Sequence, residues 1–379
     1  MTTHTKKLRS YTIVTIAALL LIIGYQVYRH RLQKSAQCDI DFIHATILEN
    51  HPGSYNEQDP DFRKNMDIAY LDAHNAIKSM RSTTDQTTIV THYLDSFHDT
   101  HVRLYPAIKN STPTHINTRH HFTIQEIPNN SVWITVPTFA PNATQQKELE
   151  AIIDQMPAYK TKNCIIFDVR NNNGSNSHWG TKIIEKLFGV EYAKLCINKI
   201  HKNIEVHWRA SKDNTHHISS LIPKLIDQFG ANAPIIQEFQ SIAHGMQKAY
   251  QQNNTFFIAH HIPQPHSHLK PNHSVTAHIA IIINARCVSA CLDFIDEMKA
   301  VDPTITLIGQ TTDADSIYMD VRVVDLPSGI GTLQFPIKMY HNRKRGHNIP
   351  YVPDISYPDT IHSPEEINEW LLQTVQKIS

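Results

Sequence analysis

The feature that most constrains the fold is the stretch 277–300, where a short apolar run is followed by a polar break and then by a helical pattern. The run 277–283 is rich in isoleucine and too short for a typical buried helix. It therefore predicts a strand covered on both faces, as in a parallel sheet. From Ser289 onward the apolar residues recur at helical spacing. The sequence thus predicts an α/β protein in which Ser289 stands where a strand turns into a helix.

The position of Ser289 suits two different roles. A serine at the start of a helix often serves only as an N-cap. Leu292 stands where a capping box would place Glu or Gln, which weakens that interpretation. The other role is that of a nucleophile, because unpaired N–H groups at a helix N-terminus can hold the oxyanion formed when a hydroxyl attacks a carbonyl. A nucleophile also needs a base and a second N–H donor.

A second strand–turn–helix precedes this one in the chain. Residues 163–169 predict a buried strand, 170–176 form a polar turn that contains Gly174, and 177–188 predict a helix ended by Gly189. Sites gather at the carboxyl ends of parallel strands, so we expect the Gly174 turn and Ser289 at the same sheet edge. A plain Asn/Gly turn is the alternative interpretation.

Residues 39–103 predict a helical N-terminal subdomain that ends at Asp99, Thr100 and His101. His101 is a candidate base because it lies where a helix passes into an alternating strand. The chain contains 26 histidines, however, so position alone is a weak argument. Residues 104–379 then predict the α/β core, with a mostly helical insertion at about 190–275.

The N-terminus carries an apolar stretch, residues 11–28, that has no charged residue and is about long enough to span a bilayer. A cleaved signal peptide is the alternative, but no suitable cleavage site follows the stretch. We therefore expect a cytoplasmic tail over 1–10 and an uncleaved transmembrane signal anchor over 11–28. The rest of the chain would lie outside the cytoplasm, on the periplasmic side of a bacterial-type inner membrane.

Composition excludes some partners and cofactors. The 35 basic and 35 acidic residues balance, which argues against nucleic-acid binding. Five cysteines are too few for a disulfide framework, and Cys287 and Cys291 are interpreted as small buried residues rather than metal ligands. The histidine-rich segment 260–268 could bind zinc, but without an HExxH or paired CxxC motif a solvated loop is favoured. We expect neither a metal nor another cofactor.

Five short segments, taken in order, resemble the tail-specific protease family, the C-terminal processing peptidases with a crotonase-like ββα core. Each segment alone is a weak signal, whereas five in the same order are a strong one. The resemblance covers roughly residues 39–355. The segments are 99–101, 165–174, 284–290, 309–312 and 353–355. Too little chain lies between Leu104 and Ser131 for a PDZ domain, which the resemblance would otherwise allow.

The resemblance implies roles for individual residues. In the tricorn-like, histidine-dependent form, Ser289 would be the nucleophile and His101 the base, with Thr100 assisting. The N–H groups of Gly174 and Ala290 would form the oxyanion hole. The acid that tricorn-like members carry just before the Pro-Asp-Ile segment is replaced here by His347, Asn348 and Ile349. We take Asp315 as the third catalytic residue instead. Lys299 does not lie where the lysine-dependent members need it.

The sequence therefore predicts a membrane-anchored serine peptidase of the tail-specific type. It would hydrolyse peptides or proteins through an acyl-enzyme on Ser289. The alternative is a catalytically inactive binding or scaffold protein with the same fold, because a fold alone does not establish a function.

Overall fold

The computed structural model describes the chain except for residues 1–2, 108–120, 261–272, 359, 362 and 379. The chain forms two compact units. The first unit comprises Met1–Ser111, His207–Ala259 and Tyr318–Met339. The second comprises Thr112–Val206, His260–Ile317 and Tyr340–Ser379. Half of the segment between Leu104 and Ser131 that bears on a PDZ domain, residues 108–120, and most of the histidine-rich segment 260–268 lie outside the described residues.

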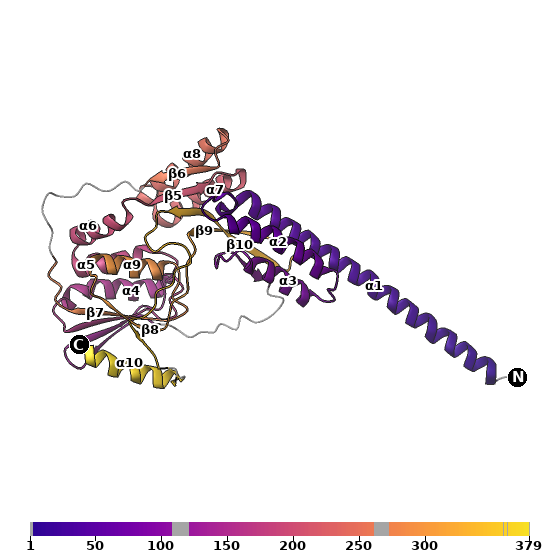
Figure 1. Cartoon of the computed structure of the whole chain (residues 1–379), viewed down its shortest axis with the longest axis horizontal. Helices are drawn as coiled ribbons and strands as arrows, with labels where there is room; N and C mark the ends of the chain where they lie inside the picture. Colours follow the sequence, from indigo (N-terminus) through magenta and orange to yellow (C-terminus); the bar gives the residue numbers. More distant parts are fainter. Residues whose placement is uncertain (1–2, 108–120, 261–272, 359, 362, 379) are drawn as a thin grey trace. The chain divides into compact units, whose positions relative to one another are not determined.

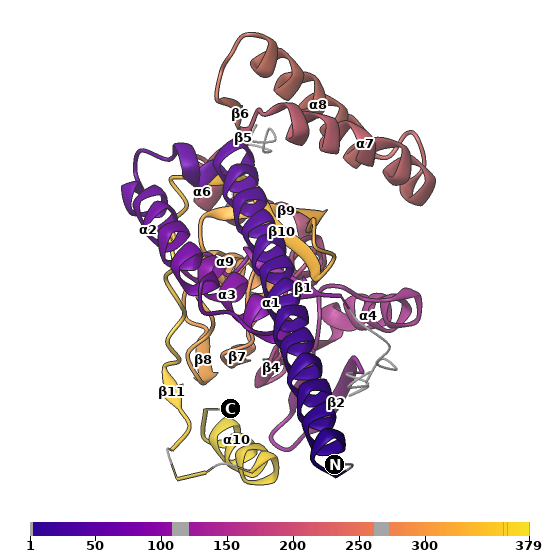
Figure 2. The ribbon, with the colours of Figure 1, turned by 90° about the vertical axis from the view of Figure 1, so that its right-hand side faces the viewer.

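The first unit combines helices with an antiparallel sheet. Its first three α-helices, α1, α2 and α3, lie side by side (Figure 1). The pair α7 and α8 packs lengthwise, as Figure 2 shows. Strands follow the order β1-β10-β5-β6, and β9 also pairs with β10. The helices are α1 (Thr3–Asn50), η1 (Pro52–Tyr55), α2 (Pro60–Ile77), α3 (Thr83–Asp95), α7 (Lys212–Phe229) and α8 (Pro234–Gln251). The strands are β1 (Arg103–Pro106), β5 (Glu205–Arg209), β6 (Phe256–His260), β9 (Tyr318–Asp325) and β10 (Gly331–His341).

The structure corrects the prediction of a transmembrane helix over residues 11–28. That stretch is not an element of its own but the N-terminal part of α1, a continuous helix of 48 residues. From Arg29 onward α1 packs within the first unit: Arg29 donates hydrogen bonds to the carbonyls of Lys78 and Met80, and Ile40 and Ile47 are fully buried. Nowhere in the described part of the chain is a helix both long and apolar enough to cross a membrane. The predicted transmembrane anchor and the inner-membrane location were therefore wrong, and a membrane partner bound through the N-terminal helix is not supported.

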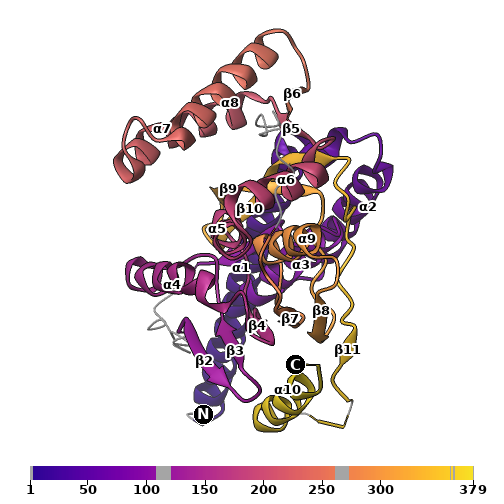
Figure 3. The same ribbon diagram turned by 90° about the vertical axis from the view of Figure 1, so that its left-hand side faces the viewer.

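The second unit is built around a six-stranded sheet in the order β11-β8-β7-β4-β3-β2 (Figure 3). All neighbouring strands are parallel except β2 and β3. The α/β core with parallel strands that the sequence predicted is thus present. The strands are β2 (Thr123–Ile127), β3 (Ser131–Thr135), β4 (Cys164–Asp168), β7 (His278–Ile283), β8 (Thr306–Gly309) and β11 (Ile355–Ser356). The helices are α4 (Ala143–Gln155), η2 (Met156–Tyr159), α5 (His178–Phe188), α6 (Val190–His201), α9 (Ala290–Val301) and α10 (Pro364–Ile378).

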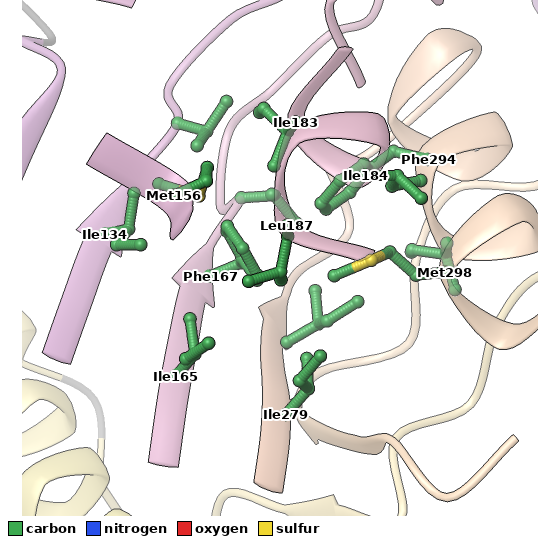
Figure 4. Close-up of a cluster of buried hydrophobic side chains, with 14 of the residues drawn as sticks. Ile134, Met156, Ile165, Phe167, Ile183, Ile184, Leu187, Ile279, Phe294 and Met298 are labelled. Atoms are coloured by element: carbon green, nitrogen blue, oxygen red, sulfur yellow. The ribbon is translucent and has the colours of Figure 1, made fainter. Parts of the chain in front are cut away.

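The two central strands, β4 and β7, are buried on both faces, as their apolar runs predicted. On one face Phe167 of β4 meets Leu187 of α5 and Phe294 of α9 (Figure 4). On the other face, Leu371 and Val375 of α10 cover the sheet. Each fully buried side chain of this size contributes about 1.5–3 kcal/mol. This packing fixes β4 and β7 as neighbours, so the turns that follow them meet at one sheet edge.

Candidate active site

Ser289 adopts a backbone conformation that few serines adopt. It is the N-cap of α9, with φ 58° and ψ −125°. A residue other than glycine in such a sparsely populated region costs about 1–3 kcal/mol, and such residues cluster at active sites. Among the described residues its side chain caps no N–H group of the helix, so the structure does not support the plain N-cap interpretation. The predicted strand–turn–helix around Ser289 is confirmed.

The Gly174 turn lies directly against Ser289. Gly174 has φ 81°, and a Cβ added to it would lie 2.7 Å from Ser289 Cβ and 2.8 Å from the backbone N of Ala290. The fully buried side chain of Asn172 holds this turn: its Oδ1 accepts the N–H of Gly174 at 3.0 Å, and its Nδ2 donates to the carbonyl of Val136. The prediction that the two turns meet at the same edge of the sheet is confirmed.

Replacing Gly174 with alanine is expected to lower both stability and any activity of Ser289. The new Cβ would add the positive-φ penalty of about 1–2 kcal/mol and a backbone clash. Chemical denaturation measures the first effect and substrate turnover the second.

Gly189→Ala is the matched control. Gly189 also has a positive φ, 93°, but nothing lies within 4 Å of its added Cβ. The Gly189→Ala variant should be destabilised only by the strain of its positive φ, and its turnover should stay at the wild-type level. Equal losses in the two variants would show that the close approach of Gly174 to Ser289 is unimportant.

Backbone N–H groups for an oxyanion come from the start of α9. Ala290 is the first residue of that helix, so its N–H has no partner within the helix. The N–H of Ser289 is donated to Asp315 Oδ1, at 3.0 Å. The N–H of Gly174 is donated to Asn172 Oδ1. In this arrangement the Ala290 N–H is the donor best placed for a developing negative charge. The N–H of Gly174 could serve as a second donor only after its hydrogen bond to Asn172 Oδ1 is broken.

Asp315, predicted as the third catalytic residue, lies in the second unit and contacts the backbone of the predicted nucleophile. Its carboxylate is fully buried. The Oδ2 atom is 3.6 Å from Nη1 of Arg345 and 3.9 Å from Nη2 of Arg343. The role of Asp315 towards a histidine remains a prediction.

A disulfide between Cys287 and Cys291 brackets Ser289. Both residues are buried, as the sequence analysis expected, but they are bonded to each other, which it did not expect. A spacing of four residues across the start of a helix brings their Cα atoms to 5.5 Å, within the usual range for a disulfide. Composition could not reveal this pair, because five cysteines give no pattern.

In the first unit, His101 shares a buried carboxylate with a second histidine. Asp99 Oδ1 accepts the backbone N–H of His101 at 3.0 Å and lies 3.3 Å from its Nδ1. Asp99 Oδ2 lies 3.1 Å from Nε2 of His51. Thr100 stands between Asp99 and His101, and its buried hydroxyl oxygen has no hydrogen-bond partner among the described residues. Sequence analysis missed Asp99 as a partner, although an Asp two residues before a His at a turn is a typical Asx-turn signal.

The hydrogen bonds fix the protonation of this group. Burial alone would raise the pKa of Asp99, but the hydrogen bonds from His101 and His51 outweigh it and hold the pKa well below its usual range. Burial lowers the pKa of His51. The N–H of Gly53 donates to His51 Nδ1, so His51 must carry its proton on Nε2 and donate it to Asp99. An ionised Asp99 therefore accepts from His101 Nδ1 and leaves Nε2 as the basic nitrogen.

If His101 is the general base that the sequence predicts, Asp99→Asn is expected to lower kcat by roughly 10⁴-fold, the loss typical when the acid that orients a catalytic histidine becomes an amide. The amide NH2 must face either His51 Nε2 or the backbone N–H of His101, and both are donors. The ring of His101 is then left in the wrong tautomer or orientation. Steady-state kinetics on a peptide substrate measures the loss.

Asp95→Asn, the nearby exposed acid at the end of α3, is the matched control and should retain wild-type kinetics. A variant Asp99→Asn that folds and turns over normally would show that His101 needs no carboxylate.

The second unit also contains a cavity of about 580 Å³ beside α9. Its lining includes Asp293, Asp296 and Glu297 of α9 and, from the segment after β10, Arg343 and Arg345. Burial raises the pKa of Asp296 to about 6 and that of Glu297 to about 8. Within the described ranges, no cluster of three or more His, Cys, Asp or Glu could hold a metal ion.

Glu297 predicts a pH dependence of stability. Because its pKa in the folded state is above its ordinary value of 4.5, the folded state binds the proton more tightly than the unfolded state. Its contribution is complete below about pH 4.5 and is lost as the pH rises to about 8. In Glu297→Gln the unfolding free energy should decrease less between about pH 4.5 and about pH 8 than it does in the wild type. Denaturant titrations at several pH values would measure this difference. An unchanged pH profile would contradict the assignment.

The comparisons with known proteins agree with this geometry. Peptidase family S41 matches residues 131–357. The chain resembles the structure of mature CPAF complexed with lactacystin, with a TM-score of 0.58 and 11% identity over 92% of this chain and 99% of that one. It also resembles a putative peptidase from Parabacteroides merdae, with a TM-score of 0.50 and 13% identity over 91% and 96% of the two chains. No curated protein matches the sequence.

These likenesses in structure are at low identity and indicate a shared fold. The family match spans the Gly174 turn, Ser289 and Asp315, whereas His101 and Asp99 precede it. Members of the matched family are serine peptidases. The chain therefore belongs to peptidase family S41, and it is a serine-type peptidase that acts on peptides or proteins.

Proposed function

We propose that the chain is a tail-specific serine peptidase in which Ser289 is the nucleophile and His101 the general base. The Ser289 hydroxyl attacks the peptide carbonyl, and its proton passes to Nε2 of His101. The C–N bond then breaks, and the protonated ring gives the proton to the leaving amine. Water then attacks the acyl carbon while His101 takes its proton, the bond between that carbon and Ser289 Oγ breaks, and His101 returns the proton to Oγ.

The observation that carries this proposal is the backbone of Ser289, held at φ 58° at the start of α9 with the Gly174 turn against it. An N-cap serine needs neither feature, whereas a nucleophile that must present its oxygen beside helix N–H groups benefits from both. Ala290 would provide an oxyanion donor, and Gly174 a second one. Asp99 would orient His101, with Thr100 beside it.

Labelling with a fluorophosphonate probe tests the proposal. The folded wild-type protein should form an adduct, and peptide mapping by mass spectrometry should locate it on Ser289. Failure of the folded protein to react would favour the inactive binding protein.

For tail specificity, two substrates that differ only in their C-terminal tail should be cleaved at different rates. Equal rates would leave a serine peptidase without tail specificity.

A further inference from the structure

We infer that Asp315 is a positioning residue that keeps Ser289 in its reactive backbone conformation. This inference rests on the proposed role of Ser289 as nucleophile. Ser289 lies in a region of φ and ψ that is unfavourable for serine, so its surroundings must hold it there. Gly174 makes room on one side of the turn. On the other side, the carboxylate of Asp315 accepts the backbone N–H of Ser289 and restrains it.

The contact between Asp315 and Ser289 is of a strong type. The backbone N–H of Ser289 donates to Asp315 Oδ1 at 3.0 Å, and Asp315 is completely buried. Hydrogen bonds to an ionised acceptor are roughly twice as strong as neutral ones, and burial removes competition from water. The backbone carbonyl of Asp315 also accepts the N–H of Asn348, which fixes the main chain behind the carboxylate.

Two arginines tie Asp315 back to the helix that Ser289 begins. Arg343 and Arg345 flank the carboxylate of Asp315. Arg343 donates to Asp293 at 2.6 Å, and Arg345 donates to Asp293 at 3.3 Å and to Asp296 at 3.0 Å. Asp293 and Asp296 both lie on α9. The two arginines therefore fix the position of the Asp315 carboxylate relative to α9. The same carboxylate binds the N-cap residue of that helix, Ser289.

The hydrogen bond to Asp315 favours the observed backbone conformation of Ser289 over the extended conformation of an ordinary N-cap. With its N–H bound to Asp315, the serine cannot rotate into the extended conformation of an ordinary N-cap, in which its hydroxyl would accept an N–H of the first helical turn. It also cannot offer its own N–H to the oxyanion, which leaves that role to Ala290. Without the acceptor, Ser289 would relax towards the ordinary cap, and its hydroxyl would be drawn away from the substrate carbonyl.

The matched pair Asp315→Asn and Asp315→Leu tests the inference. The two side chains are uncharged and similar in size, but only Asn keeps an oxygen that can accept the N–H of Ser289. Rates of fluorophosphonate labelling should fall about 100-fold for Leu, the cost of a misplaced nucleophile, and much less for Asn. In peptide hydrolysis the loss should lie in kcat, with KM unchanged. Asp313→Leu, at a neighbouring acid whose side chain accepts the N–H of Ala314 in its own turn, should label at the wild-type rate.

The outcomes separate the two proposals. A wild-type protein that does not label at all overturns the proposed role of Ser289. A wild-type protein that labels, with Asn and Leu variants that label equally fast, overturns only the positioning role of Asp315. Circular dichroism and thermal melts identify a Leu variant that has not folded.

A second measurement does not depend on activity or on the Leu variant. Val288 and Ser289 form the only Val-Ser pair in the sequence. Carbonyl-¹³C valine and amide-¹⁵N serine labelling therefore gives a single correlation, that of the Ser289 amide. In Asp315→Asn its proton resonance should move upfield, because a neutral acceptor binds the N–H more weakly than a carboxylate. A shift no larger than that in Asp313→Asn would overturn the inference.

Discussion

Ser289→Ala is expected to abolish hydrolysis, lowering kcat by on the order of 10⁶-fold, as when the nucleophile is removed from other serine peptidases. Alanine keeps the backbone but loses the oxygen that forms the acyl-enzyme in the proposed mechanism. The variant should also fail to react with fluorophosphonate. Turnover of a peptide substrate and intact-protein mass spectrometry measure the two losses.

The matched control is Ser177→Ala. Ser177 is a partly buried serine at the start of a helix of the same unit, and its hydroxyl donates to Asp293. Its loss should leave labelling intact. Stability offers a second contrast: Ser289 makes no side-chain cap, so Ser289→Ala should cost less than the roughly 1 kcal/mol typical of a lost N-cap. Residual activity near the wild-type level in a homogeneous preparation of Ser289→Ala would rule out Ser289 as the nucleophile.

The strand–turn–helix at Ser289 could be predicted because its signals are local. The isoleucine run fixes a buried strand, and the period then changes to that of a helix. The position of the Gly174 turn beside Ser289 could be predicted in the same way, since two parallel strands place the turns that follow them at one sheet edge. The packing of Gly174 against Ser289 is the physical consequence of β4 pairing with β7.

What could not be predicted depends on contacts between distant residues. The partner of Asp315 is a backbone N–H 26 positions away, and a sequence pattern carries no signal for such a bond. His51 lies 48 positions before Asp99 and looks like an ordinary helix-ending residue. The transmembrane prediction failed for a different reason. Residues 11–28 are part of the 48-residue helix α1, and within the described residues no helix, α1 included, is both long and apolar enough to cross a membrane.

His101→Ala is expected to lower kcat about as far as Ser289→Ala, on the order of 10⁶-fold, because an unactivated serine hydroxyl is a weak nucleophile at neutral pH. Fluorophosphonate labelling should slow in parallel, since that reaction also needs the base. His98→Ala is the matched control. His98 lies three residues earlier in the segment between α3 and β1 and is exposed, and its loss should leave kcat unchanged.

The double variant Ser289→Ala/His101→Ala provides the decisive comparison. Residues that act as one catalytic unit are strongly non-additive, so the double variant should be no slower than either single variant. Two residues with independent roles would instead multiply their losses. Ser289 and His101 belong to different units of the fold, and the cycle tests their cooperation by kinetics alone. Additive losses would mean that another base serves Ser289 and that the Asp99–His101 pair acts elsewhere in the protein.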